Sequence, residues 1–229
     1  MKNNSTTLLV GACLVALGGC VSAPSIDATA NQSFDGLTPI KGTAMRQVWA
    51  DEEFDLTGYT KVMLQGSEIH YRPVKGNATS RFRSSASEFP LTEEQKDRLE
   101  VVFDEQFEKA LRDMERYEVV EERGPDVLLV RGTLIDVVSK VPPEGPGRTE
   151  YYLDSVGQAT FVVEFVDSQS DAVLIRGVDT RAAGSQGPTM ASNRVTNTSE
   201  VRRLASYWAN MLVAGLNELT TFDATIPQE

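Results

Sequence analysis

The chain is poor in the residues that most often carry chemistry. Its 229 residues include two cysteines, Cys13 and Cys20, and a single histidine, His70. A signal peptide ending at residue 19 would remove Cys13, and lipidation would occupy the sulfur of Cys20. The mature protein would then hold neither a free thiol nor a disulfide. With one imidazole and no thiolate, a zinc site would depend on carboxylates, so we expect no metal and no cofactor.

Recognisable catalytic motifs are also missing. The sequence has no Gly-x-Ser-x-Gly or Ser-x-x-Lys nucleophile motif and no phosphate loop. His70 lies beside Tyr71 and Arg72 without an evident nucleophile or orienting partner, so we expect it to be structural or on the surface. The acidic run at 167–171 lacks the glycine and distal Glu of a calcium loop and predicts a polar hairpin turn. We therefore expect a protein that is not an enzyme.

Positive charge is scarce. The chain has 22 Lys and Arg against 33 Asp and Glu, a formal net charge of −11. Removal of residues 1–19 takes away one charged side chain, Lys2, which changes −11 to −12. Phosphate backbones repel a protein this acidic, so nucleic acid is excluded as a partner. The acidic residues at 91–116 alternate with Lys and Arg at salt-pair spacing, which predicts a solvated helix face and not a catalytic carboxylate pair.

The amino terminus has the composition of a signal peptide. Lys2 stands before an apolar, small-residue run from Leu8 to Gly19. As a helix this run reaches roughly 18 Å, well short of the roughly 30 Å hydrocarbon core of a bilayer. The run is therefore expected to be the apolar core of a signal peptide over residues 1–19, and not a membrane-spanning helix.

The stretch "LGGC" at residues 17–20 resembles the bacterial lipobox. Cleavage between Gly19 and Cys20 would make Cys20 the lipidated first residue, held at the membrane by several acyl chains. The alternatives are a secretory cut after Ala23 and an uncleaved, buried segment. The lipoprotein resemblance also implies sorting by the next residue. Val21 stands there instead of Asp, so we expect an outer-membrane protein that faces the periplasm.

The remainder of the chain suits one globular domain. Residues 20–44 are mainly Ser, Ala, Thr, Asn, Gly and Pro without a period, which predicts the lipidated cysteine and a flexible linker. A single α+β domain is expected over 45–222, with a short tail over 223–229.

Hydrophobic periodicity predicts two helices and several strands. Thr92 and Gln95 form a capping box for a helix over 91–116, and a second apolar stripe predicts a helix over 198–220. Alternating or Val-rich runs predict strands, with a bulge at Gly66, over 59–73, 117–122, 127–141, 158–167 and 172–182. The later strands are expected to form an antiparallel meander. The simplest arrangement is a two-layer α+β sandwich of two amphipathic helices on a mostly antiparallel sheet of four to five strands.

Two basic groups and one loop are candidate contact sites. The basic residues are Arg72, Lys75, Arg81 and Arg83 before the first helix, and Arg194, Arg202 and Arg203 at the last. We expect both groups to balance surface charge; binding of an anionic lipopolysaccharide or peptidoglycan is the alternative. Residues 142–152 are expected to be a plain connection. If they form a contact loop instead, Tyr151 and Tyr152 are its anchors.

The order of these segments resembles a known family. The relevant runs are "YTKVMLQGSEIHY", "LTEEQKDRLEVVFDEQFEKAL", "PDVLLVRGTLIDV", "GQATFVVEFVDSQSDAVLIRGVDTRA" and "YWANML". They are similar to segments of proteobacterial lipoproteins that share the domain of unknown function 3313 (DUF3313). The resemblance runs from Tyr59 to Leu219, and it implies the fold and an envelope location, without an activity or site residues.

These observations predict a lipid-anchored envelope protein that binds an envelope protein or glycan, as an assembly or transport accessory. Two other functions stay open. A carrier of a lipid or hydrophobic ligand needs an apolar cavity on the order of hundreds of Å³. A periplasmic hydrolase needs a cleft with two converging carboxylates, or a Ser within hydrogen-bond reach of a Lys.

Overall fold

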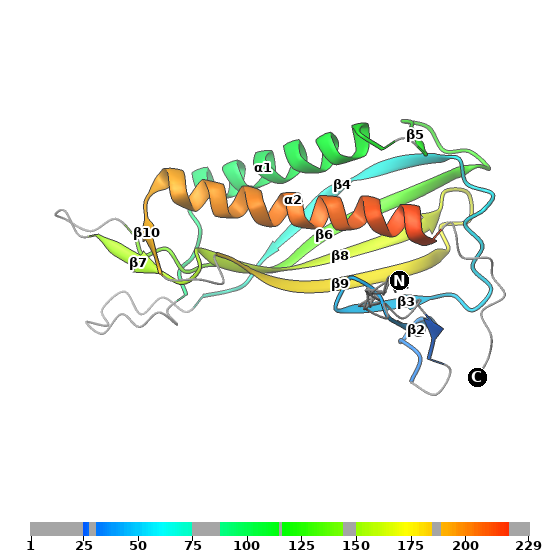
Figure 1. Cartoon of the computed structure of the whole chain (residues 1–229), viewed down its shortest axis with the longest axis horizontal. Coiled ribbons are helices and arrows are strands. Elements are labelled where there is room, and N and C mark those ends of the chain that lie inside the picture. The colour runs from blue at the N-terminus through cyan, green and yellow to red at the C-terminus, as the bar shows by residue number, and fades with distance from the viewer. Residues whose placement is uncertain are drawn as a thin grey trace, which may run out of the picture.

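The structure is a computed structural model that describes residues 25–27, 31–74, 88–114, 116–143, 150–184 and 189–219. Figure 1 shows two layers, with both helices on one face of a large sheet. The elements in chain order are β1 (Ser25–Ile26), β2 (Thr38–Lys41), β3 (Gln47–Ala50), β4 (Lys61–Tyr71), α1 (Glu93–Arg112), β5 (Glu118–Val119), β6 (Val127–Ser139), β7 (Tyr151–Leu153), β8 (Gly157–Asp167), β9 (Val173–Ala183), β10 (Met190–Ser192) and α2 (Arg194–Leu219).

The main sheet has eight strands in the order β1-β2-β3-β9-β8-β6-β4-β5, and β7 and β10 form a separate two-stranded ribbon. β6, β8 and β9 form the expected antiparallel meander. The acidic run at 167–171 forms the β8–β9 turn, as predicted: Asp167 Oδ1 accepts hydrogen bonds from the Ser170 backbone N–H at 2.7 Å and the Ser170 hydroxyl at 2.7 Å.

β4 and β6 run parallel because α1 connects them. Their register runs from Lys61 opposite Val127 to Tyr71 opposite Val137, with one irregularity between Ile69 and Tyr71 and another between Gln65 and Glu68. That irregularity confirms the bulge expected at Gly66. A helix between two strands returns the chain to the same end of the sheet, so the strands pair parallel. The two-layer α+β arrangement is as expected, but the expected count of four to five strands is wrong: the sheet has eight strands and is mixed, because β4 pairs parallel with both β5 and β6.

Three of the additional strands lie near the amino terminus. β1 pairs with β2, β2 with β3, and β3 with β9, all antiparallel. Leu37, Thr38 and Ile40 are buried. Composition predicts a flexible linker over 20–44, but Ser25–Ile26 and Thr38–Lys41 within that range are already strands of the sheet.

Both helices begin at side-chain caps. The Thr92 hydroxyl accepts from the Gln95 N–H, and the Gln95 side chain accepts from the Thr92 N–H, which confirms the capping box. α2 begins at Arg194, four residues earlier than periodicity predicts. The Asn193 side chain accepts a hydrogen bond from the Thr196 N–H and fixes this earlier start. In the described part of the chain, neither helix combines the length and the apolar character needed to cross a bilayer.

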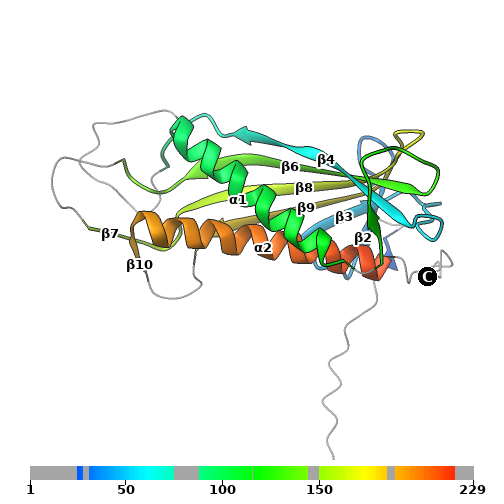
Figure 2. The same ribbon diagram turned by 90° about the horizontal axis from the view of Figure 1, so that it is seen from above.

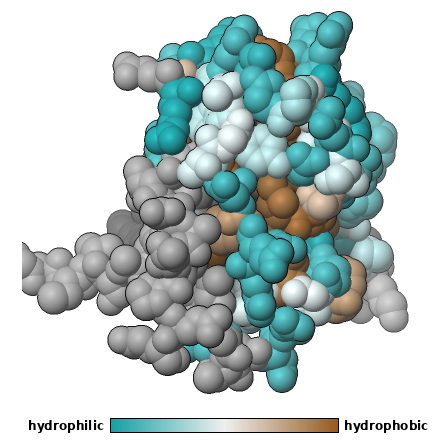
Figure 3. Space-filling view, turned by 90° about the vertical axis from the view of Figure 1, so that its right-hand side faces the viewer, coloured by the Kyte–Doolittle hydropathy of each residue, from teal (hydrophilic) through white to brown (hydrophobic). Residues whose placement is uncertain are grey.

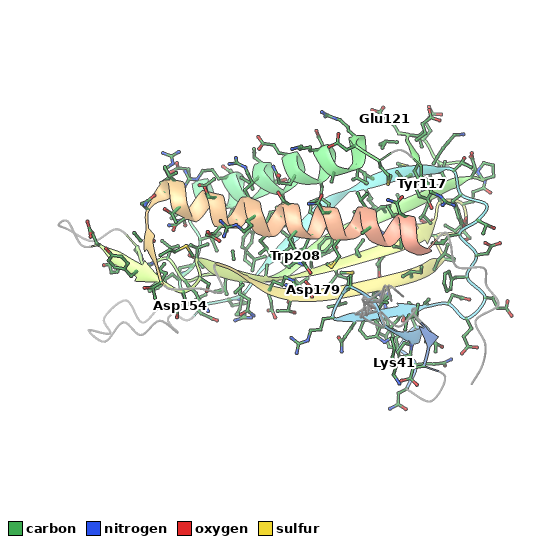
Figure 4. All side chains as sticks on the ribbon, viewed as in Figure 1. Lys41, Tyr117, Glu121, Asp154, Asp179 and Trp208 are labelled. Carbon is green, nitrogen blue, oxygen red and sulfur yellow. The ribbon has the colours of Figure 1, made fainter. Side chains whose placement is uncertain are left out.

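The sheet beneath α2 is closely packed. Trp208 is fully buried, and its ring lies 5.5 Å from that of Phe161 on β8. The indole N–H donates to Oδ2 of the buried Asp179 on β9 at 2.8 Å, and Arg181 donates to the same oxygen at 2.7 Å. Figure 4 shows Trp208 and Asp179 meeting between α2 and β9. The carboxylate thus joins the helix to the sheet inside the core.

The helix-free face of the sheet carries a row of paired charges. Glu164 on β8 accepts hydrogen bonds from Arg131 on β6 at 3.3 Å and from Arg176 on β9 at 2.8 Å. Arg176 also pairs with Asp35 at 2.6 Å. Since each of these charges is matched by a neighbour, this row is structural.

Candidate binding groove beside strand β4

Helix α1 crosses the sheet obliquely, from the β4 side toward α2, as Figure 2 shows from above. A hollow of about 260 Å³ remains between the helix and the strands. Its lining residues come from five elements: Leu64, Gln65 and Gly66 (β4), Asp104, Phe107, Glu108 and Leu111 (α1), Val130 and Gly132 (β6), Phe161 (β8) and Leu212 (α2).

The floor of the hollow is apolar and bare. Val130 and Phe161 form its deeper, buried part, whereas Leu64 keeps 36% of its surface exposed. Gly66 and Gly132 present no side chain. A Cβ added to Gly66 would meet no atom within 4 Å, so this part of the strand surface is open space. The hollow therefore offers an apolar recess to a side chain from outside.

One side of α1 forms an acidic wall above β4. Its residues recur every three or four positions, the spacing of a single helix side: Glu93, Asp97, Glu100, Asp104 and Glu108. We call this set the acidic stripe. The opposite side of α1 faces α2, where the Ser206 hydroxyl donates to Gln106 at 2.6 Å. Glu93 and Glu108, at the ends of the stripe, have basic partners one turn away, but among the described residues the three acids between them have no ion-pair partner.

The acidic stripe changes the ionisation of its neighbours. Burial against the hollow, followed by the negative charges of Glu100 and Glu108, raises the pKa of Asp104. At the end of β4, burial and then the charges of the stripe raise the pKa of the Tyr71 hydroxyl. Burial is the larger cause of both shifts and the acids of the stripe add to each, while Lys96 Nζ lies 4.9 Å from the centre of the Tyr71 ring. A cation beside the stripe would relieve the repulsion.

The outer edge of β4 is open over most of its length. β5 pairs with β4 only at Lys61 and Val62. From Met63 to Tyr71, no strand of the described chain lies on that side. The hollow, the acidic stripe and this open edge adjoin one another, and we refer to them together as the β4 groove.

The residues singled out in the sequence lie elsewhere. Gly19 and Cys20, the expected cleavage and lipid sites, fall outside the described residues. His70 is on the surface of β4, with Nε2 3.3 Å from Glu68 and its side chain 62% exposed. Within the described ranges, no group of three His, Cys, Asp or Glu could hold a metal ion.

The basic residues do not form one cationic surface. Arg72 pairs with Glu88 at 2.6 Å and lies 3.6 Å from Asp136, and Arg203 pairs with Glu200 at 2.8 Å. Lys75, Arg81 and Arg83 lie outside the described residues. Arg194 and Arg202 line a second hollow, of about 340 Å³ between the two helices, whose other lining includes Glu94, Asp97 and Glu105. This mixed charge does not favour an anionic ligand.

The remaining candidate surfaces are limited in extent. Tyr152 on β7 is 60% exposed and Tyr151 is half-buried, and they pair with β10 in the small ribbon. Figure 3 shows the end of the molecule at which both helices finish, where a small apolar area is ringed by hydrophilic residues. Neither surface combines a recess with a charge pattern, unlike the β4 groove.

Sequence reasoning missed the β4 groove. From the sequence, the acidic residues of α1 are expected to lie on a solvated face and to pair with Lys and Arg. Glu108 and Arg112 do form the predicted pair, at 2.6 Å. The predicted partner of Lys109, Glu105, instead lies 3.9 Å from Arg202. The signal that could have revealed the stripe is its spacing, since the acids fall on one helix side while most of the basic residues fall on another.

Several solved structures are distantly similar to the chain. The PelC dodecamer from Paraburkholderia phytofirmans is 12% identical, with 72% of this chain and 95% of that chain covered and a TM-score of 0.34. Protein XCC0632 from Xanthomonas campestris is 10% identical, with 75% and 90% covered and a TM-score of 0.41. The hypothetical protein CT253 from Chlamydia trachomatis is 9% identical, with 70% and 98% covered and a TM-score of 0.35. At these scores the likenesses carry no argument.

The search of curated proteins and the family comparison differ in outcome. No curated protein matches the chain. The model of a family described as "Protein of unknown function (DUF3313)" matches residues 28–212, most of the chain and nearly all of the sheet and helices. The chain therefore belongs to the DUF3313 family of proteins of unknown function.

Proposed function

We propose that this protein is a lipid-anchored module of the cell envelope that binds another envelope component through the β4 groove. The anchor in this proposal is Cys20, exposed by cleavage after Gly19, and the location is the periplasmic side of the outer membrane. The observation that carries the binding role is the hollow, where an apolar floor adjoins an acidic wall. Binding sites typically combine an apolar recess with a few convergent polar groups.

The proposed role is binding and not catalysis. Two carboxylates, Asp104 and Glu108, line the hollow. They lie one turn apart on the same helix, so both approach a ligand from one side. In glycosidases the two carboxylates of the catalytic pair flank the bond that is cleaved. The arrangement therefore favours attraction of positive charge over acid–base chemistry.

A carrier function has weaker support than a surface binding function. The hollow measures about 260 Å³, below the roughly 300–1,000 Å³ typical of ligand pockets. It is open along the β4 edge. The second hollow, of about 340 Å³, has a largely charged rim. These dimensions suit one or two side chains of a partner better than an enclosed lipid.

The anchor is tested by the mass and the membrane fraction of the protein from its native host. We expect the mature chain to begin at Cys20, with acyl chains on it, and Cys20→Ala to leave the membrane fraction. Retention of residues 1–19 or an unmodified sulfur would reject the anchor, while the binding role would remain open to its own test.

The binding role is tested by photo-crosslinking in intact cells. A benzoylphenylalanine at Leu64, inside the hollow, should yield one reproducible adduct that mass spectrometry assigns to an envelope component. The same group at Tyr152, which is exposed on the distant β7–β10 ribbon, is the matched control. No adduct at Leu64, or the same adducts at both positions, would contradict a binding site in the groove.

A further inference from the structure

We propose that the open edge of β4 receives an extended, cationic and apolar segment of a partner protein as an additional strand. This inference rests on the proposed function and deepens it, because it selects a protein over a glycan and states how that protein is held. Strand addition at a sheet edge is a general mode of peptide recognition, in which main-chain hydrogen bonds supply affinity and alternate side-chain pockets supply specificity.

The first support is the direction of the backbone groups. The carbonyls of Thr60 and Val62 point away from β6, because they accept hydrogen bonds from Glu118 at 3.2 Å and Val120 at 2.9 Å. Lateral direction alternates along a strand, so the N–H and C=O of Leu64 also point to the open side. β5 thus occupies the first part of the edge and leaves the next part available.

The bulge divides this edge without closing it. On the far side of the bulge, the Arg72 N–H donates to Val137 of β6 at 3.0 Å, so the N–H and C=O of Tyr71 and Ile69 point outward. Two short stretches of the edge therefore present main-chain donors and acceptors. A glycan has no repeating donor and acceptor at this spacing, whereas an extended polypeptide does.

The second support is the hollow. A strand added next to Leu64 points every second side chain toward the α1 layer, beside an apolar floor that includes Val130 and Phe161. Gly66 leaves the entrance bare. One apolar side chain of the partner therefore enters the recess of about 260 Å³.

The third support is charge. The neighbouring side chains of the added strand that point toward α1 lie under the acidic stripe. There, Asp97, Glu100 and Asp104 have no ion-pair partner among the residues described. A Lys or Arg at these positions meets that negative charge. A second copy of this chain is a poor occupant, because pairing β4 with β4 would bring two acidic stripes together. The complementary partner segment therefore carries both basic and apolar residues on the face that points toward α1.

The test uses the mature, lipidated protein in nanodiscs and two labelled peptides, acetyl-KTVTKTVTK-amide and acetyl-ETVTETVTE-amide, which place Lys or Glu together with Val on one face of an extended strand. Fluorescence anisotropy should detect binding of the Lys peptide and not of the Glu peptide. Glu100→Gln with Asp104→Asn should weaken binding by about three- to tenfold. The control, Glu94→Gln with Glu105→Gln, removes the same charge from another side of α1 and should leave affinity within about twofold of the unmodified protein.

A second pair of variants tests the hollow. Gly66→Phe fills it and should abolish binding, whereas Gly58→Phe, at a loop glycine whose Cβ would also meet nothing within 4 Å, should not. Hydrogen exchange of the bound protein should show protection of the Leu64 amide. This readout separates strand addition from charge attraction, which would leave that amide unchanged.

The outcomes separate this inference from the proposed function. If the Lys peptide fails to bind, or binds without protecting Leu64, or loses affinity equally in both double variants, strand addition is overturned. A crosslinked adduct at Leu64 in cells would then still support the groove as a binding site. Concentration-dependent protection of Leu64 without peptide would identify a second copy as the occupant and would also overturn the inference.

Discussion

The two sides of the sheet's helical layer differ in how completely they are filled. Beneath α2, Trp208 is fully buried against Phe161, and Asp179 receives two donors. Beneath the β4 side of α1, a hollow of about 260 Å³ opens beside the acidic stripe and a strand edge that is open as far as the described residues go. One helix covers its strands and the other crosses them obliquely. The filled side therefore accounts for much of the stability of the fold, and the open side is where a partner can be held.

Substitution of Trp208 should expose this difference most strongly. Trp208→Ala would empty a fully buried site and remove a hydrogen bond from the buried Asp179, so we expect a loss of about 3–5 kcal/mol in the free energy of unfolding. Urea denaturation followed by circular dichroism measures it. Val195→Ala, on the same helix but 77% exposed, should change stability by less than about 0.5 kcal/mol. Equal effects would refute the contrast.

Substitution of two glycines, one in a crowded place and one beside the hollow, tests the same difference in packing. A Cβ at Gly157, where β8 begins, would lie 2.6 Å from the carbonyl oxygen of Val138. Gly157→Ala should therefore destabilise the fold by about 1–3 kcal/mol, because the backbone must move. Gly66→Ala meets no atom and should be neutral or stabilising by up to about 1 kcal/mol. Thermal unfolding of both variants measures these changes. A loss of stability in Gly66→Ala would mean that other atoms fill the hollow.

A carboxylate in the β8–β9 turn should stabilise the protein. Hydrogen bonds from the Ser170 hydroxyl and backbone, with one from Tyr59, lower the pKa of Asp167 from the usual 3.8 to about 2. The stabilisation is therefore present above pH 3.8 and is lost as the pH falls through about 2. With solvent screening, Asp167→Asn should cost about 1 kcal/mol at pH 7, and this cost should shrink below pH 3.8 and disappear once the pH is below about 2. A pH-independent cost would contradict this assignment.

The open side should show the reverse sign. Burial and neighbouring charge raise the pKa of Asp104, so its ionised form opposes folding at neutral pH, and stability rises as acid protonates it. Asp104→Asn should stabilise the protein at pH 7 by at most about 0.5 kcal/mol, and the gain should vanish in acid. Glu105→Gln is the matched control. A loss of stability in Asp104→Asn alone would mean that Asp104 has a structural partner.

Local sequence signals predicted much of the fold. Thr92 and Gln95 form the expected capping box at the start of α1, and the strand pattern around Gly66 correctly predicted the bulge. The parallel pairing of β4 with β6 was missed because α1 was treated as a cover and not as a crossover between them. The first two strands were missed because they are only two and four residues long, too short for a periodic pattern, and they join the sheet through β3, which pairs with β9.

The β4 groove could be predicted only in part. The spacing of Glu93, Asp97, Glu100, Asp104 and Glu108 is legible in the sequence. The hollow is not, because it results from the angle at which α1 crosses the sheet, and periodicity reports which helix side is apolar without reporting that angle. The open edge depends on how few residues of β5 pair with β4, which is also a tertiary outcome.

The position of β1 sets how far the domain can stand from a lipid surface. If Cys20 carries the lipids, residues 21–24 are the only tether before Ser25 enters β1, a reach of roughly 15 Å. β1 and β4 are separated by five strands in the sheet order, so their edges lie roughly 30 Å apart. If the tether holds the β1 edge of the sheet close to the bilayer, the opposite edge, at β4, faces the aqueous compartment.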